Sequence, residues 1–139
     1  MSKLGRYAAD RKKVTTLTNA VSTTGTVAQC GTVFIATGAS GTTTYVLPAI
    51  ANAGQGWWCK VVKSAAAGAG GTIVVSGHAD DGGSCMVGIE SSLTSVAIAG
   101  DDITLADGTD PGALVEVICD GSQWLVHAVA STAADVTIA

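Results

Sequence analysis

The sequence is poor in charged residues. Asp, Glu, Lys and Arg make up 13% of its 139 residues, against about 25% in an average soluble domain. Hydrophobic residues make up 47%, which excludes an intrinsically disordered chain, because such chains bury too little apolar surface to fold. So little charge is also unusual for a small monomer that faces water on every side.

Aromatic residues, proline and long apolar runs are also scarce. Aromatic residues make up 4%, and the chain has 18 Gly but only 2 Pro, so it is neither collagen-like nor a Pro-rich linker. No apolar run reaches the roughly 18 residues that a membrane-spanning helix needs, and the N-terminus lacks the apolar stretch of a signal peptide. We therefore expect a protein that is made in a cytoplasm and has no membrane partner.

The four cysteines are widely spaced and include no C-x-x-C pair. Structural zinc sites usually draw their ligands from such close pairs, so this spacing argues against zinc. A cytoplasmic origin argues against disulfides. We expect mostly buried free thiols that pack as small apolar side chains. The four residues are Cys30, Cys59, Cys85 and Cys119.

Residues suited to catalysis are few. Of the two histidines, His127 lies in a predicted strand, where a structural role is the usual one. His78 precedes Asp80 and Asp81, a pattern that suits either an acid–base pair or a metal ligand set, but also an ordinary polar turn. We favour the turn. There is no G-x-S-x-G nucleophile motif, and we predict a non-enzymatic protein with no catalytic residue and no cofactor.

The glycine-rich and acidic loops carry no complete ligand motif. Residues 68–71 lack the Lys-Ser/Thr of a phosphate-binding loop and do not open a helix. The acidic loops at 101–102 and 107–110 offer oxygen ligands, but not with the spacing of a calcium-binding loop. Turn formation explains these loops better than calcium does, and we predict no metal site.

Charge is distributed unevenly along the chain. Residues 1–13 carry a net charge of +4, whereas residues 14–139 carry −8. The sequence thus predicts a basic N-terminal arm, residues 1–13, attached to a single β-domain, residues 14–139. Either the arm is a solvated tail, or it lies on an acidic partner. Nucleic acid is disfavoured as that partner because the body is acidic. The arm residues expected to bind are Lys3, Arg6, Tyr7, Arg11, Lys12 and Lys13.

A long segment has no charge at all. Residues 14–59 contain no Asp, Glu, Lys or Arg and are rich in Thr, Ser and Gly. Hydroxyl groups alone can keep such a surface in solution. The same composition suits a surface that is buried against other chains, because interface cores are depleted in charge. The sequence leaves both interpretations open.

Short Val-, Ile- and Thr-rich segments separated by glycine-containing turns predict an all-β fold, either an antiparallel β-sandwich or a jelly-roll-like barrel with an extended N-terminal arm. Helical turns are expected only in the arm and at 49–53. The expected strands are residues 14–17, 32–36, 43–47, 57–63, 72–77, 85–89, 96–98, 103–105, 113–120, 124–130 and 135–138.

The last two long strands predict a hairpin around Asp120-Gly121, whose glycine supplies the positive φ of a tight turn. Both faces of this hairpin are largely apolar, so we expect it to be central or covered on both sides. Trp124 is expected to close one end of the core. Because Trp57 and Trp58 are adjacent, they point to opposite sides of a strand, and at least one should face outward or a neighbouring subunit.

Two segments resemble a known class of domain. Residues 45–62 read YVLPAIANAGQGWWCKVV, and residues 115–126 read VEVICDGSQWLV. They resemble the L-P…A-G-x-G-aromatic segment and the closing D-G-S/T-x-W-x-V hairpin of small β-domains in tailed-bacteriophage virion proteins, most of all capsid decoration (cement) proteins. The likeness covers roughly residues 30–130.

This resemblance implies a structural virion protein at the capsid surface. It would bind the outer surface of the major capsid protein shell and stabilise it, as a homotrimer, with its arm on the shell. Trp57, Trp58 and Trp124 would lie in the core or at subunit interfaces. The alternative is a head-fibre or tail-fibre knob that attaches to a host or binds glycans, which would need an aromatic side chain open to solvent. A small hydrolase or isomerase would instead need His78 and a carboxylate converging in a pocket.

Overall fold

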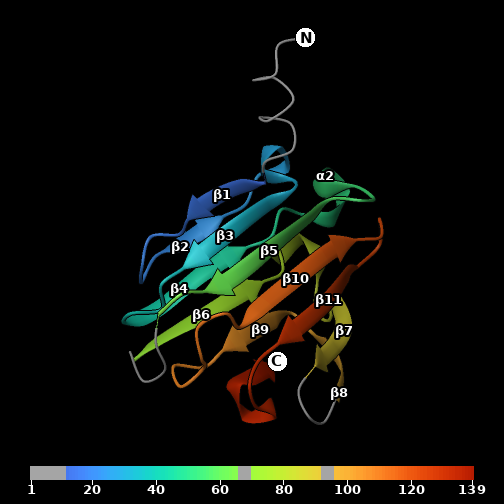
Figure 1. Ribbon diagram of the computed structural model, residues 1–139. Coiled ribbons are helices and arrows are strands. Elements are labelled where there is room, and N and C mark those ends of the chain that lie inside the picture. The colour runs from blue at the N-terminus through green and yellow to red at the C-terminus, as the bar shows by residue number, and fades with distance from the viewer. Residues whose placement is uncertain (1–11, 66–69, 92–95) are drawn as a thin grey trace, which may run out of the picture.

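The computed structural model describes residues 12–65, 70–91 and 96–139, which fold into two β-sheets packed face to face (Figure 1). The strand order of the seven-stranded sheet is β1-β3-β5-β10-β11-β7-β8, and that of the five-stranded sheet is β12-β9-β6-β4-β2. The expected all-β, sandwich-like fold is confirmed. Among the described residues, no helix is long and apolar enough to span a membrane.

The strands of the seven-stranded sheet are β1 (Lys13–Thr16), β3 (Thr32–Ala36), β5 (Trp58–Lys63), β7 (Met86–Ser91), β8 (Val96–Gly100), β10 (Leu114–Cys119) and β11 (Trp124–Val129). Those of the five-stranded sheet are β2 (Ser22–Thr24), β4 (Gly41–Val46), β6 (Gly71–Ser76), β9 (Asp102–Leu105) and β12 (Val136–Ile138). Short helical turns are η1 (Val27–Gln29), α2 (Ile50–Ala53), η2 (Ala79–Asp81) and η3 (Ala133–Asp135).

Both sheets are mixed, not purely antiparallel as the sequence suggested. From β1 to β6, successive strands lie in alternate sheets. Each strand from β3 onward therefore lies beside the strand two places before it in the chain, and the two run in the same direction. β1, β3 and β5 are therefore parallel neighbours, as are β2, β4 and β6. The later strands add antiparallel pairs, including the β10–β11 hairpin. Local alternation of apolar residues is the same in both cases, which is why the sequence did not reveal the parallel winding.

Most predicted strands lie within two residues of their observed bounds. β2 was missed because its three residues are Ser and Thr, with no apolar alternation to mark a strand. The turn predicted at 49–53 is confirmed as α2. Lys13, which we assigned to the arm, instead begins β1. A helical turn was also expected in the arm. Of the arm residues, the structure describes only Lys12 and Lys13.

The core lies between the sheets and contains most of the large side chains. The Phe34 and Tyr45 rings, from opposite sheets, have centroids 4.2 Å apart, and the Trp57 and Trp124 rings meet edge to face at 5.4 Å. The predicted hairpin occupies the middle of the seven-stranded sheet, as expected. Its inward-facing residues are all buried; they are Val115, Val117, Cys119, Trp124, Val126 and Ala128.

Candidate interaction face

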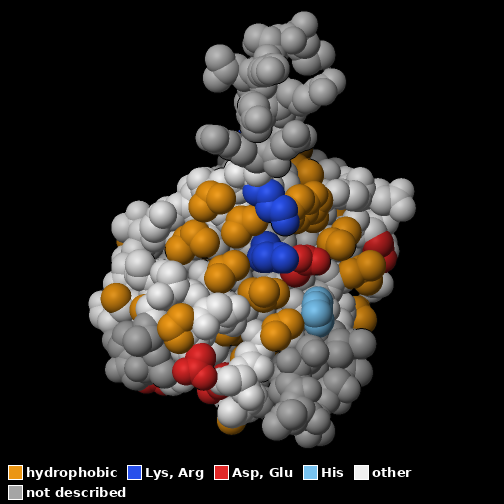
Figure 2. All heavy atoms as spheres, in the orientation of Figure 1, with side chains coloured by type: hydrophobic (Ala, Val, Ile, Leu, Met, Phe, Trp, Pro, Cys, Tyr) orange, Lys and Arg blue, Asp and Glu red, His pale blue; other side chains and the backbone are white. Residues whose placement is uncertain are grey.

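The side of the seven-stranded sheet that is turned away from the core, here called the outer face, is largely apolar (Figure 2). Strand register places its residues in three rows that cross the strands. The first apolar row is Trp58, Ile118, Leu125 and Val87. The second is Ile35, Val62, Leu114 and Val129. The middle row between them is Val14, Val33, Lys60, Glu116 and His127.

Much of this apolar surface faces solvent in the single chain. Ile118, Leu125 and Val87 are 42%, 43% and 40% exposed, and Val14 is 63% exposed. These are four of the six strongly exposed large hydrophobic side chains among the described residues. Single exposed apolar residues are common on proteins, but contiguous rows of them mark interaction surfaces.

The only charged pair on the described part of the outer face sits in the middle row. Lys60 Nζ lies 2.7 Å from Glu116 Oε2, and the two side chains are 25% and 34% exposed. They come from neighbouring strands at register-paired positions, so the pair is built into the sheet. Because the two charges cancel, this pair brings no net charge to the middle row.

The three tryptophans fall into two groups. Trp57 is 3% exposed and Trp124 is fully buried, so both belong to the core. The Trp57 indole N–H donates a hydrogen bond to the Val27 carbonyl oxygen at 3.1 Å. Trp58 points the opposite way, as adjacency predicted, and is half-buried on the outer face beside Gly31. No tryptophan is therefore fully open to solvent, as a glycan-stacking platform would require.

Of the predicted arm residues, the structure places two. Lys12 is exposed, and Lys13 lies at the start of β1, where its Nζ donates a hydrogen bond to the Ala28 carbonyl oxygen at 2.8 Å. Lys13 is thus held against the body. The others lie outside the described residues; they are Lys3, Arg6, Tyr7 and Arg11.

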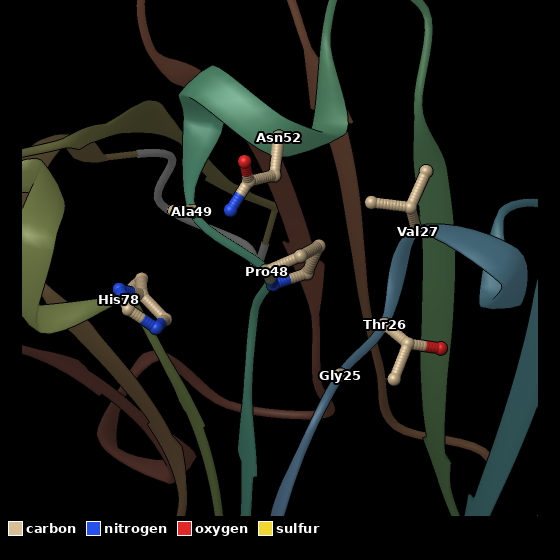
Figure 3. A pocket seen from close by; sticks show the side chains of 7 residues that line it. All are labelled: Gly25, Thr26, Val27, Pro48, Ala49, Asn52 and His78. Atoms are coloured by element: carbon tan, nitrogen blue, oxygen red, sulfur yellow. The ribbon is translucent and has the colours of Figure 1, made fainter.

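A shallow cavity of about 390 Å³ lies where the β2–η1 connection, the start of α2 and the segment after β6 meet. The side chains of Asn52 and His78 point into the space beside Pro48 (Figure 3). The Asp80 carboxylate lies close to the imidazole, with its Oδ2 3.4 Å from His78 Nδ1. Asp81 is turned elsewhere, because its Oδ1 accepts a hydrogen bond from the Ile50 N–H at 2.9 Å. His78 Nδ1 accepts one from the Asp80 N–H at 3.1 Å, which is the turn geometry expected from the sequence.

Metal-ligating side chains are dispersed. Within the described residues, no group of three or more His, Cys, Asp or Glu side chains is placed to hold a metal ion. The cysteines are unpaired; Cys30 is exposed, and the other three are buried as expected. Burial raises the pKa of the Cys59, Cys85 and Cys119 thiols above the usual range, with the Asp101 carboxylate adding to the effect at Cys85. These thiols are therefore protonated and weakly nucleophilic at neutral pH.

Among the residues whose burial is described, one charged residue, Lys63, is completely buried, and no pattern in the sequence marked it. It is the last residue of β5 and faces inward, in register with the core residues of that strand. Its Nζ donates hydrogen bonds to the carbonyl oxygens of Ala106 and Asp107 at 2.8 and 2.9 Å. Burial lowers the pKa of Lys63, while the charges of Asp107 and Asp135 partly oppose that shift. Its role is to join β5 to the β9–β10 turn.

Comparison with known proteins gives no relative. No protein-family model matches the chain, and neither a curated protein nor a solved structure is significantly similar to it.

Proposed function

We propose that this protein is a structural component of a bacteriophage virion, a decoration (cement) protein that binds the outer surface of the major capsid protein shell and stabilises it as a homotrimer. The observation that carries the proposal is the outer face, which has one row with exposed aliphatic side chains, a second row of half-buried ones and an ion pair between them. A surface of this kind suits permanent contact with other protein chains. The resemblance of residues 45–62 and 115–126 to virion β-domains supplies the kind of assembly.

The charge distribution supports different contacts for the N-terminal segment and for the body of the protein. The first 13 residues carry +4, and the rest of the chain carries −8. In the proposed role, the basic segment reaches an acidic surface of the shell while the body joins its neighbours. Many weak contacts from each oligomer then stabilise the shell through multivalency, without any catalytic step.

Co-sedimentation with empty shells, made from the major capsid protein encoded in the same genome, tests this role. Removing residues 1–11 leaves β1 intact, because that strand begins at Lys13. We expect the full chain to sediment with the shells and to raise their melting temperature, and the shortened chain to lose most of its binding. Arg6→Gln with Arg11→Gln is the control that removes charge without removing length, and it should weaken binding in a salt-dependent way.

Two results contradict the proposal at different points. Failure of the full chain to bind shells contradicts the decoration role. Full binding by the shortened chain contradicts the part assigned to the N-terminal segment.

A further inference from the structure

We infer that the outer face is the contact between copies of this chain, and that Lys60 of each copy pairs with Glu116 of its neighbour in the assembly. The occupant is therefore a second copy, not the shell. This inference rests on the proposed function only for the number of copies, which is three.

The charge of the outer face selects the occupant. Lys60 and Glu116 neutralise each other at 2.7 Å, so the middle row offers no net charge to a basic segment or to an acidic shell surface. The outer face of a second copy has the same apolar rows and the same neutral middle row, and it therefore matches this surface. The basic N-terminal segment and the shell are correspondingly less suited to this face.

The rows then determine how the copies meet. If three sheets surround an axis that runs along the strands, each row becomes a layer around that axis: two apolar layers with a charged layer between them. Lys60 lies on β5 and Glu116 on the adjacent β10, in the same order in every copy. Going around the axis, Lys60 of each copy therefore comes beside Glu116 of the next, and positive and negative charges alternate.

The charged layer also fixes the register. Sliding one copy along the strands by a row would bring Lys60 or Glu116 against aliphatic side chains such as Leu125 and Leu114. Each copy would then bury its own Lys60–Glu116 pair against apolar side chains, and the cost of removing both charges from water would not be offset by contacts with charges of the neighbour. The middle row thus acts as the polar layer of a coiled coil does, reducing the number of alternative arrangements.

A matched pair of variants tests whether this face is the contact. Leu125 lies on the outer face and Val21 lies off it, just before β2, yet both are 43% exposed. We expect sedimentation velocity at micromolar concentration to give a trimer for the wild type and for Val21→Glu, and a monomer for Leu125→Glu. Circular dichroism checks that both variants fold. An unchanged mass for a folded Leu125→Glu overturns the inference.

A charge exchange tests the pairing itself. The double variant Lys60→Glu with Glu116→Lys keeps the ion pair within each copy and between identical copies. In an oligomer that mixes it with the wild type, Glu116 of a wild-type copy meets the carboxylate introduced at position 60 of its neighbour. We expect the two proteins, mixed and allowed to exchange subunits, to sort into unmixed oligomers by native mass spectrometry. Statistical mixing overturns the pairing.

These outcomes separate the inference from the proposed function. If the protein is a trimer that binds shells and Leu125→Glu does not dissociate it, only the inference about the contact between copies is contradicted. A trimer that Leu125→Glu dissociates but that never binds shells removes the decoration role and leaves the contact between copies standing.

Discussion

The ammonium group of Lys63 donates a hydrogen bond to the carbonyl oxygen of Ala106 at 2.8 Å, entirely out of contact with solvent. Asp107 and Gly71 supply further carbonyl oxygens at 2.9 and 3.4 Å. The amine therefore ties the end of β5 to the turn that follows β9 and to the first residue of β6, which lies in the opposite sheet. It links the two layers of the sandwich.

Replacing this amine is expected to destabilise the fold. Lys63→Met keeps the length of the side chain but leaves buried carbonyl oxygens without a donor, which should cost about 1–3 kcal/mol. Urea denaturation measures the loss. Lys12→Met is the control, because Lys12 is exposed and substitutions at such positions usually change stability by less than about 0.5 kcal/mol. Equal losses for the two variants would contradict the role given to Lys63.

The same residue predicts a pH dependence. Burial lowers the pKa of Lys63 below its ordinary value of 10.5, so the native protein releases this proton at a lower pH than the unfolded chain does. The free energy of unfolding of the wild type, taken relative to Lys63→Met, should therefore rise with pH between the native pKa and 10.5. The buried thiols act in the opposite direction, but they are common to both proteins and cancel in the difference. A difference that falls with pH in this window would contradict the assignment.

Thiol reactivity should separate one cysteine from the others. Cys30 is exposed, whereas Cys59, Cys85 and Cys119 are buried and have raised pKa values. We expect iodoacetamide to alkylate Cys30 in the native protein and all four thiols in guanidinium chloride. Peptide mass spectrometry identifies the modified residues. Rapid alkylation of Cys119 without unfolding would contradict the burial of this thiol.

Close packing of the strands beside the hairpin predicts a sharp contrast between two glycines. A Cβ atom on Gly88 in β7 would collide with the carbonyl oxygen of Val126 in β11, whereas one on Gly108 would meet nothing within 4 Å. Gly88→Ala should therefore lose about 1–3 kcal/mol of stability, and Gly108→Ala should change it by less than about 0.5 kcal/mol. Thermal unfolding measures both, and similar melting temperatures would contradict the packing of β7 on β11.

The two core tryptophans differ in their polar atoms. Trp57 Nε1 donates to the Val27 carbonyl oxygen, whereas the buried Trp124 Nε1 has no hydrogen-bond partner among the described residues. Both substitutions to Phe remove similar ring area. Trp57→Phe should therefore be the more destabilising by about 1 kcal/mol, the net value of one hydrogen bond. Denaturant midpoints with equal slopes provide the comparison, and the reverse order would contradict it.

The strands could be predicted from the sequence, but their arrangement in the two sheets could not. Alternation identified the strands from Thr32–Ala36 to Trp124–Val129 and the inward side of the hairpin, because each signal is local. The parallel winding of β1 to β6 and the register between β5 and β10 depend on contacts between distant segments. For that reason the Lys60–Glu116 pair and the apolar rows around it could be recognised only in the structure. The sequence did predict that the second face of the hairpin is apolar. Lys63 was hidden for the same reason, since nothing near it in the sequence marks a buried amine.

Coverage of the outer face by other protein chains underlies both the proposed role and the contact between copies. Hydroxyl-radical footprinting of the protein at micromolar concentration detects such coverage, because the radicals oxidise exposed aliphatic and aromatic side chains. We predict that Ile118 and Leu125 are protected, whereas Val21, which is as exposed as Leu125 in the single chain, is oxidised. Oxidation of Leu125 to the same extent as Val21 would show that nothing covers this face.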